Sequence, residues 1–393
     1  MNTKINTTDL DDVLNRGVEE IIDRANLEKK LKSGQQLRIK LGIDPTSPNI
    51  HLGRSIPLLK LKDFQDLGHK IVFIIGDFTG IIGDTSDKDS ERPMLTEETV
   101  AANLKNYIDQ AAKVIDISKT EIHHNSEWLG KLKYKDISLQ ANSFSLNEFI
   151  SRDNIARRLN AGKRVSLREL LYPLMQGYDS VEIKADVEIG GTDQRFNLLA
   201  GRDLQRLYGQ ETQDILTNPL VEGLDGRKMS SSFGNTINLL DTPNDMFGKT
   251  MSLKDEYIIK YFTLMTRVDM KLVGEYDKEL KSGVNPRDIK IKLASEIVRM
   301  YYSEKDAKEA AEYFTKTISN KEVPDEIDEF KATQYDIISI LVGAKLEASN
   351  SRARRTIEQG GVKINGEVVK DIKFLVPVNS VLQKGKFKFV KII

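Results

Sequence analysis

The sequence contains no cysteine, one tryptophan and four histidines among its 393 residues. Without cysteine, the chain can form no disulfide, no thiolate nucleophile and no cysteine-ligated zinc site. It also lacks any run of about 18 apolar residues, the length that a membrane-spanning helix needs, and its first residues lack the apolar centre of a signal peptide. These absences predict a soluble, cytoplasmic protein.

Net charge is absent as well, because 59 basic residues balance 59 acidic ones. Neutrality argues against a nucleic-acid partner only if the charge is evenly spread. It is not, since residues 331–393 carry a net charge of +7 and residues 1–330 carry −7. Such asymmetry is typical of a polyanion-binding appendage on an acidic body, although a solvated, lysine-rich domain explains the charge equally well.

Hydrophobic residues make up 39% of the chain, enough for a core, and the length predicts more than one domain. Strand and helix signals alternate in the first half, which predicts an α/β fold with a parallel sheet covered by helices. The candidate strands are residues 36–43, 70–76 and 182–189; an apolar-periodic stretch, 50–67, follows the first, and a helical pattern, 194–208, follows the third. Helical patterns then dominate at 257–265, 287–302 and 305–314, and the acidic segment 320–329 has the composition of a linker.

Three segments combine residue types that suit nucleotide binding. In HLGR, His51 and Arg54 lie at i, i+3 on one face of a helix that follows a strand, and Gly53 permits close ligand approach. GRKMSSS (226–232) is a hydroxyl-rich loop with two cations. GGTDQ (190–194) follows a strand and places Asp193 to accept from ribose hydroxyls. Taken singly, each is weak evidence. A lone histidine is more often a packed or surface residue, and a basic, serine-rich loop is usually just solvated. A capped helix start explains Thr192 but not the double glycine.

HLGR, GGTDQ and KMSSS occur in this order, and together they resemble the signatures of class I aminoacyl-tRNA synthetases, which are written HIGH and KMSKS. The finer resemblance is to tyrosyl-tRNA synthetases, particularly their second bacterial subtype. It rests on LGIDPTSPNIHLGR, FIIGDFTGIIGD, LLYPLMQGYDS, DVEIGGTDQRFNLLAGRDLQ and GRKMSSSFGN. The C-terminal SRARRTIEQGGVKINGEVV resembles the family's S4-type RNA-binding domain.

The resemblance implies an architecture and a reaction. It predicts a Rossmann-like catalytic domain over 1–235 with a helical insertion at about 120–177, an α-helical domain over 236–325, and a small α+β S4-like domain over 331–393. The implied reaction joins tyrosine to ATP as tyrosyl-adenylate, releases pyrophosphate, and passes the tyrosyl group to the 3′ end of tRNA(Tyr). ATP enters as a substrate with Mg²⁺, and we expect no organic cofactor, no protein-held metal and no membrane partner. The family also implies a homodimer formed through the insertion.

No side chain needs to act as a nucleophile in this reaction, so positioning and charge stabilisation carry it. The resemblance assigns catalytic roles to His51, Arg54, Lys228 and Ser231. It places in the ATP site Asp44, Thr46, His51, Gly53, Arg54, Lys88, Arg92, Gly191, Asp193, Lys228, Met229, Ser230, Ser231 and Ser232. Lys88 and Arg92 match family residues that hold the pyrophosphate, but they are equally well explained as exposed loop charges.

The resemblance also implies the tyrosine site: Lys40, Asp84, Tyr172, Gln176, Asp179 and Gln194. Within this set, Asp179 is expected to face the phenolic hydroxyl. Tyr172, Gln176 and Asp179 fall at i, i+4 and i+7, on one face of a helix. A buried acceptor for the hydroxyl would reject phenylalanine by roughly 10⁴ to 10⁵.

The basic tail reads as a helix, a glycine turn and a hairpin whose Asn365-Gly366 is a strong two-residue turn signal. In this region we expect RNA contacts from Arg352, Arg354, Arg355 and Lys363. Cations of this kind bind RNA phosphates with salt-dependent affinity and little sequence specificity.

Three residues depart from the family pattern. Lys40 stands where the commoner subtype has a tyrosine, Arg54 replaces the last histidine of HIGH, and Ser231 replaces the lysine of KMSKS. Two rival hypotheses remain: a ligase for tryptophan, and an RNA-binding relative that has lost the activation reaction. Asp179 and the basic tail disfavour the first, and the retained polar residues of the site disfavour the second.

Overall fold

A computed structural model of the chain describes residues 7–86, 90–91, 93–319, 327–385 and 388–393. Contacts divide the chain into two units. Unit 1 holds residues 1–240 and 253–284, and unit 2 holds residues 241–252 and 285–393. The linker predicted at 320–329 lies largely outside the described residues.

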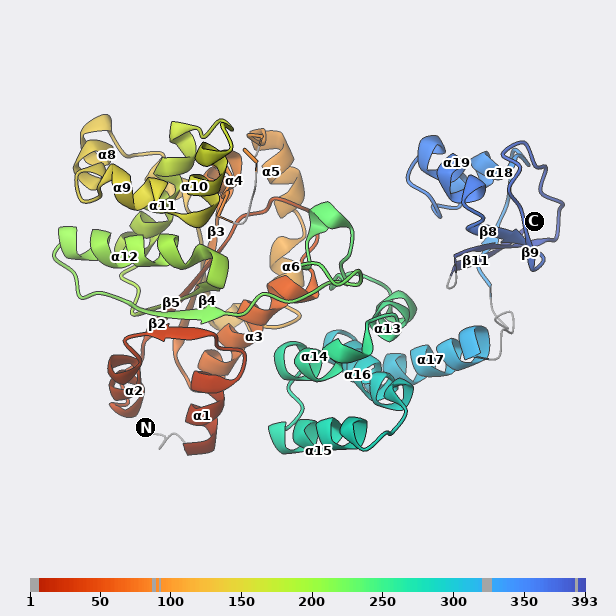
Figure 1. Cartoon of the computed structure of the whole chain (residues 1–393), viewed down its shortest axis with the longest axis horizontal. Helices are drawn as coiled ribbons and strands as arrows, with labels where there is room; N and C mark the ends of the chain where they lie inside the picture. Colours follow the sequence, from red (N-terminus) through yellow and green to blue (C-terminus); the bar gives the residue numbers. More distant parts are fainter. Residues whose placement is uncertain (1–6, 87–89, 92, 320–326, 386–387) are drawn as a thin grey trace. The chain divides into compact units, whose positions relative to one another are not determined.

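A six-stranded sheet forms the centre of unit 1, in the order β1-β6-β5-β2-β3-β4 (Figure 1). Its strands are β1 (Glu20–Ile22), β2 (Arg38–Ile43), β3 (Lys70–Ile75), β4 (Thr120–His124), β5 (Val187–Gly191) and β6 (Asp214–Asn218). All neighbours pair in parallel except β1 with β6. β3 is buried at every position but its first, as its nearly apolar sequence predicts. The predicted α/β fold class is therefore confirmed.

Two of the predicted strands match β2 and β3, but the third was placed too early. Glu182 still belongs to helix α11 (Leu167–Glu182), and β5 begins only at Val187. The chain turns between them through Lys184, whose φ of 51° lies in the left-handed region. β4 and β6 were not predicted, because their polar sequences TEIHH and DILTN lack an apolar run.

Helices cover the sheet, and several of them follow its strands directly along the chain. The principal ones are α2 (Arg24–Lys32), α3 (Leu52–Asp66), α4 (Asp77–Ile82), α5 (Glu97–Leu104), α6 (Tyr107–Ala111), α11 and α12 (Arg195–Leu207). β2 leads into α3, β3 into α4 and β5 into α12, so three loops meet at the carboxyl edge of the parallel strands (Figure 1). In open α/β sheets this edge is where ligands bind.

The region predicted as an insertion begins with a strand of the sheet, since residues 120–124 form β4. Four helices follow: α7 (Ser126–Leu129), α8 (Tyr134–Ala141), α9 (Leu146–Ile150) and α10 (Asp153–Asn160). Figure 1 shows α8, α9 and α10 beside α11.

Two helices from the second half of the chain pack with unit 1, namely α14 (Ile258–Met265) and α15 (Met270–Lys281). Arg16, which follows α1 (Thr7–Asn15), is buried and fastens them. Its guanidinium donates to the carbonyls of Phe262, Thr263, Thr266 and Val268 at 2.8–3.1 Å. The contacts thus divide residues 236–325 between the two units. That this stretch forms one α-helical domain stays a prediction.

Unit 2 combines helices with a second sheet. Its helices are α13 (Pro243–Met251), α16 (Pro286–Tyr301), α17 (Glu304–Phe314), α18 (Ile337–Gly343) and α19 (Asn350–Glu358). Its sheet has the order β7-β11-β10-β8-β9, formed by β7 (Glu329–Phe330), β8 (Val362–Ile364), β9 (Glu367–Val368), β10 (Val381–Lys384) and β11 (Lys388–Ile392). Asn365 and Gly366 have φ of 48° and 89° and connect β8 to β9, which confirms the predicted hairpin.

Candidate active site

A cleft at the carboxyl edge of the unit 1 sheet collects most of the predicted site residues. Those that line it are Asp44, Thr46, His51, Gly53, Arg54, Asp84, Tyr172, Gln176, Asp179, Gly191, Asp193, Gln194, Lys228, Met229, Ser230, Ser231 and Ser232. Lys88 and Arg92 lie outside the described residues. Lys40 is described but does not line the cleft.

His51 closes the N-terminus of α3. Its Nδ1 accepts from the backbone N–H of Arg54 at 3.3 Å, so the neutral ring carries its proton on Nε2. Burial, together with the nearby charges of Arg54 and Lys228, lowers the pKa of His51 to about 3. At neutral pH, His51 is therefore an uncharged hydrogen-bond donor in the cleft.

Arg54, the departure from HIGH, is held in place by its neighbours. Its guanidinium donates to the hydroxyls of Tyr107 at 2.6 Å and Thr46 at 2.9 Å. A fixed guanidinium is a suitable donor to phosphate oxygens. Tyr107 was not predicted to belong to the site. It is identified only by its position in the structure, where it is buried on α6.

Asp44, at the end of β2, is fully engaged by its neighbours. It accepts from the hydroxyls of Thr79 at 2.7 Å and Tyr172 at 2.8 Å. A Cβ on Gly76 would overlap both Asp44 Oδ1 and Thr79 Oγ1, so only glycine fits there. Tyr172 is thus oriented by Asp44, which joins the predicted ATP side of the cleft to the predicted tyrosine side.

The double glycine of GGTDQ has a steric reason. A Cβ on Gly191 would overlap Asp193 Oδ1, and a Cβ on Gly190 would lie 3.0 Å from Leu198. The side chain of Gln194 accepts from the Gly191 N–H at 3.2 Å. Glycine at these two positions therefore lets the end of β5 lie close to the side chains of Leu198 and Asp193. The Asp193 carboxylate lies in the cleft.

The KMSSS loop meets both other motifs. Lys228 Nζ lies 2.9 Å from Asp193 Oδ2, and Gly53 N–H contacts the Met229 sulfur at 3.2 Å. Ser231 Oγ lies 3.3 Å from Ser47 Oγ in the loop after β2. The Lys228 ammonium thus sits on the carboxylate that the resemblance assigns to ribose, so a bound nucleotide would compete with it for Asp193.

The other end of the cleft is lined by α11. Tyr172, Gln176 and Asp179 are buried on one face of this helix, as their spacing predicts. Burial raises the pKa of Asp84, although the N–H and hydroxyl of Ser86 donate to its carboxylate at 2.9 and 2.6 Å. These groups offer carboxylate and amide acceptors for a small cation.

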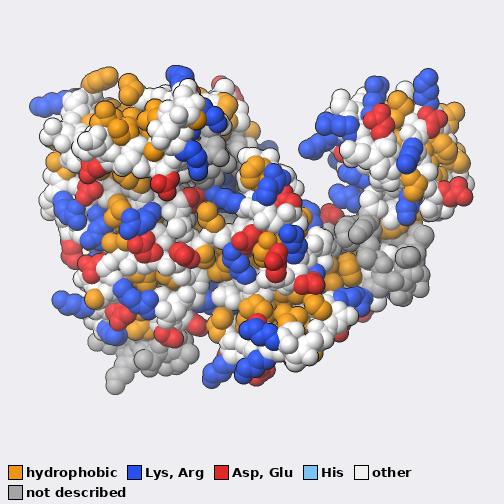
Figure 2. All heavy atoms as spheres, viewed as in Figure 1, with side chains coloured by type: hydrophobic (Ala, Val, Ile, Leu, Met, Phe, Trp, Pro, Cys, Tyr) orange, Lys and Arg blue, Asp and Glu red, His pale blue; other side chains and the backbone are white. Residues whose placement is uncertain are grey.

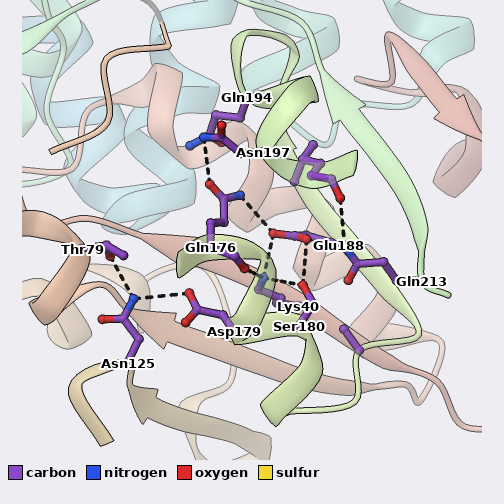
Figure 3. A network of polar contacts seen from close by, with 12 residues as sticks. Lys40, Thr79, Asn125, Gln176, Asp179, Ser180, Glu188, Gln194, Asn197 and Gln213 are labelled. Atoms are coloured by element: carbon purple, nitrogen blue, oxygen red, sulfur yellow. Dashed lines mark hydrogen bonds and ion pairs between the residues drawn. The ribbon is translucent and has the colours of Figure 1, made fainter. Parts of the chain in front are cut away.

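Asp179 is held by two residues that the sequence did not reveal. Trp128 Nε1 donates to its carboxylate at 2.7 Å. Asn125 Nδ2 donates to it at 3.3 Å (Figure 3). Burial raises the pKa of Asp179 to about 7, and the charge of Lys40 is the strongest influence that opposes this rise. Trp128 is the single tryptophan of the chain, which is the one sequence signal that could have singled it out.

Lys40 was expected among the tyrosine-binding residues, but the structure places it outside the cleft lining. Its ammonium is fully buried and pairs with Glu188 at 2.9 Å beneath α11, so it is not placed to contact a ligand directly. Glu188 was also missed. A charged residue in the otherwise apolar VEIGG strand was the signal for it.

The predicted RNA-binding residues lie in unit 2. Arg352, Arg354 and Arg355 are exposed on α19, and Lys363 is partly exposed on β8. Figure 2 shows several Lys and Arg side chains on the visible face of this part of the chain. The opposite face of α19 contributes Ala353 and Ile357 to the hydrophobic core of this part of the chain.

Comparison with known proteins defines the class first. The family model "tRNA synthetases class I (W and Y)" matches residues 32–319. The model "Tyrosine--tRNA ligase SYY-like C-terminal domain" matches residues 316–392. The chain is therefore a class I aminoacyl-tRNA synthetase.

Individual relatives show which family within this class the chain belongs to. The tyrosine–tRNA ligase of Thermotoga maritima is 46% identical over 97% of this chain and 96% of its own length. That of Mannheimia succiniciproducens is 44% identical over 96% of this chain and 97% of its own length. A solved tyrosyl-tRNA synthetase of Archaeoglobus fulgidus, complexed with L-tyrosine, superimposes with a TM-score of 0.62 at 25% identity, covering 78% of this chain and 99% of that one. The chain belongs to the tyrosine–tRNA ligase family.

Within the described residues, no group of three or more histidine or acidic side chains could hold a metal ion. None of the helices in the described ranges is long and apolar enough to cross a membrane.

Proposed function

We propose that the chain activates tyrosine with ATP and transfers it to tRNA(Tyr). The observation that carries this proposal is the buried Asp179 carboxylate, which lines the same cleft as residues of HLGR, GGTDQ and KMSSS. A buried acceptor selects a phenol over a phenyl group because an unmatched acceptor is costly.

In the activation step, the tyrosine carboxylate attacks the α-phosphate of ATP and pyrophosphate leaves. The neutral His51 Nε2–H, the Arg54 guanidinium and the Lys228 ammonium stabilise the charge that develops on the phosphate oxygens. Asp193 accepts from the ribose hydroxyls once Lys228 has exchanged Asp193 for phosphate. Tyr172, Gln176 and Asp84 hold the ammonium group, and Asp179 accepts from the phenol.

Mg²⁺ belongs to this proposal as a companion of ATP. Mg²⁺ is commonly bound through substrate phosphates and one or two carboxylates, so we expect the phosphates of the nucleotide to supply most of its ligands in this site. Ser231, in place of a lysine, leaves Lys228 and Arg54 as the described cations of the cleft that face the phosphates.

The remaining parts of the proposal concern partners. The exposed Arg352, Arg354, Arg355 and Lys363 bind tRNA phosphates. A second copy of the chain covers apolar side chains of the insertion, since Tyr134, Leu146 and Leu167 are 88%, 63% and 77% exposed. The reaction takes place in the cytoplasm.

Tyrosine-dependent exchange of pyrophosphate into ATP tests the activation step on the purified chain. We expect exchange with tyrosine and none with tryptophan or phenylalanine at equal concentration. Exchange with tryptophan alone would show that the chain is a ligase for tryptophan. Exchange with neither tyrosine nor tryptophan would favour the RNA-binding relative that has lost the activation reaction.

A further inference from the structure

Two charged residues face each other in the middle of the sheet. Lys40 in β2 and Glu188 in β5 are paired in register in neighbouring parallel strands. Their side chains are 0% and 1% exposed, and Lys40 Nζ lies 2.9 Å from Glu188 Oε1. The pair lies outside the cleft lining, so it is not itself a binding surface.

The pair is the centre of a polar network beneath α11 (Figure 3). Lys40 Nζ donates to the backbone carbonyl of Gln176 at 2.9 Å and to Ser180 Oγ at 2.7 Å. Glu188 accepts from Gln176 Nε2 and from Ser180 Oγ, both at 3.1 Å, and also from Gln213. The network therefore grips α11 at two residues that are four positions apart.

Gln176 is fixed from three directions. Lys40 holds its carbonyl, Glu188 accepts from its side-chain N–H, and Asn197 donates to its side-chain oxygen at 3.1 Å. An amide with both ends engaged has a single orientation. The turn that carries Gln176 also carries Asp179, the next residue of α11 to line the cleft.

Stability alone does not account for such a pair. Burying two charges costs desolvation free energy that their attraction repays only in part, and apolar side chains of similar size are often as stable. This pair instead contacts Gln176, which lines the cleft, and Ser180, which directly follows Asp179 on the same helix, so it serves to place the turn that carries both cleft residues.

We propose that the Lys40–Glu188 ion pair is the positioning device of the tyrosine subsite, which holds Gln176 and Asp179 at the distances that a bound tyrosine requires. The inference rests on the proposed function. Lys40 and Glu188 are positioning residues, since they contact Gln176 directly and act on Asp179 through the turn of α11 that carries both.

The electrostatic effect of the pair points the same way. Lys40 lowers the pKa of Asp179, against burial and against the nearby charge of Glu188. The other polar groups that face Asp179 are the donors Trp128 and Asn125 and the hydroxyl of Tyr172. Removing Lys40 together with Glu188 therefore changes the pH dependence of tyrosine binding as well as its strength.

The test removes both charges together in the full-length chain, as Lys40→Met/Glu188→Gln. This double variant leaves no orphan buried charge, whereas either single variant would. We expect the KM for tyrosine in pyrophosphate exchange to rise at least tenfold, with the KM for ATP within twofold of the parent. The pH at which tyrosine binding is half lost is expected to move upward.

Binding is measured separately from catalysis through the fluorescence of Trp128, the single tryptophan, which contacts Asp179 directly. We expect the dissociation constant for tyrosine to rise by the same factor as the KM. Loss of turnover with unchanged tyrosine affinity and an unchanged pH profile would overturn the proposal.

A second lysine–carboxylate pair, with a buried lysine and a partly buried aspartate, provides the control. Lys60 is 1% exposed and lies 3.1 Å from Asp63 on α3, and it is not part of the cleft. Lys60→Met/Asp63→Asn removes a lysine–carboxylate pair away from the cleft, and it also takes the carboxylate partner of Arg267. We expect lower thermal stability and an unchanged KM for tyrosine. An equal rise of this KM in the control would reduce the effect of the first variant to general destabilisation and overturn the proposal.

Ser180→Ala keeps the test decisive if the double variant fails to fold. It removes one hydroxyl that touches both Lys40 and Glu188 and changes no charge. We expect a three- to tenfold weaker tyrosine affinity, and an affinity equal to that of the parent would contradict the proposal. Absence of exchange in the parent itself would instead refute the proposed function.

Discussion

Replacement of Asp179 by asparagine isolates the group that we expect to recognise the substrate hydroxyl. The substitution keeps the shape of the side chain and exchanges one acceptor oxygen for an N–H₂ donor. In the parent, the two carboxylate oxygens already accept from Trp128 at 2.7 Å and Asn125 at 3.3 Å. In the variant, one neighbouring donor or the substrate hydroxyl faces another donor.

The size of the effect follows from the charge of the acceptor. A hydrogen bond to an ionised group contributes roughly 1.5–3 kcal/mol, which is about 10- to 150-fold in an equilibrium constant. We therefore expect kcat/KM for tyrosine to fall by about 10- to 150-fold. Phenylalanine donates no hydrogen bond to this group, so its kcat/KM changes little and the preference for tyrosine falls by a similar factor.

The pH dependence gives an independent check. Burial raises the pKa of Asp179 to about 7, so the charged acceptor is lost as the pH falls through 7 and the KM for tyrosine rises. The native carboxyl keeps its proton between its ordinary pKa of 3.8 and about 7, where the unfolded chain has released it. Stability from this group therefore decreases as the pH rises through that range. Asp179→Asn removes both dependences.

The assay is pyrophosphate exchange at saturating ATP, with tyrosine and phenylalanine compared at about pH 6, 7 and 8. Fluorescence of Trp128 reports binding in parallel. If the tyrosine-to-phenylalanine ratio and its pH dependence are the same in Asp179→Asn as in the parent, Asp179 does not face the hydroxyl.

Three further predictions address other parts of the chain. Gly76→Ala places a Cβ against Asp44, so we expect the KM for ATP to rise at least tenfold while the fold, followed by circular dichroism, persists. Lys228→Met removes a donor to the developing charge, and we expect kcat for exchange to fall by about 10²- to 10³-fold with tyrosine affinity unchanged in the fluorescence titration. Arg352→Ala/Arg355→Ala leaves exchange intact but weakens tRNA binding, and the slope of its logarithm against salt falls by roughly two. An unchanged slope would remove α19 from the RNA interface.

The fold was predictable where patterns were local. The apolar run of β3 and the spacing of α11 needed only the periodicity of a strand and of a helix. β4 and β6 escaped because their stability comes from pairing within the sheet and not from their own composition. The packing of residues 253–284 with unit 1 depends on contacts of Arg16 with chain segments about 250 residues away, which no local signal contains.

The site was predictable where a residue belongs to a motif. HLGR, GGTDQ and KMSSS lie in the cleft as expected. Asn125, Trp128 and Glu188 were not found, because they act on other side chains and carry no motif of their own. Lys40 was noticed as a departure, but its partner and its burial required the register of β2 against β5.

Tyrosine-dependent pyrophosphate exchange by the unmodified chain tests the central claim most directly. The account predicts exchange with tyrosine, a preference over phenylalanine of roughly 10⁴ to 10⁵ in kcat/KM, and no exchange with tryptophan. Exchange with phenylalanine comparable to that with tyrosine, or no exchange with any amino acid, would contradict it.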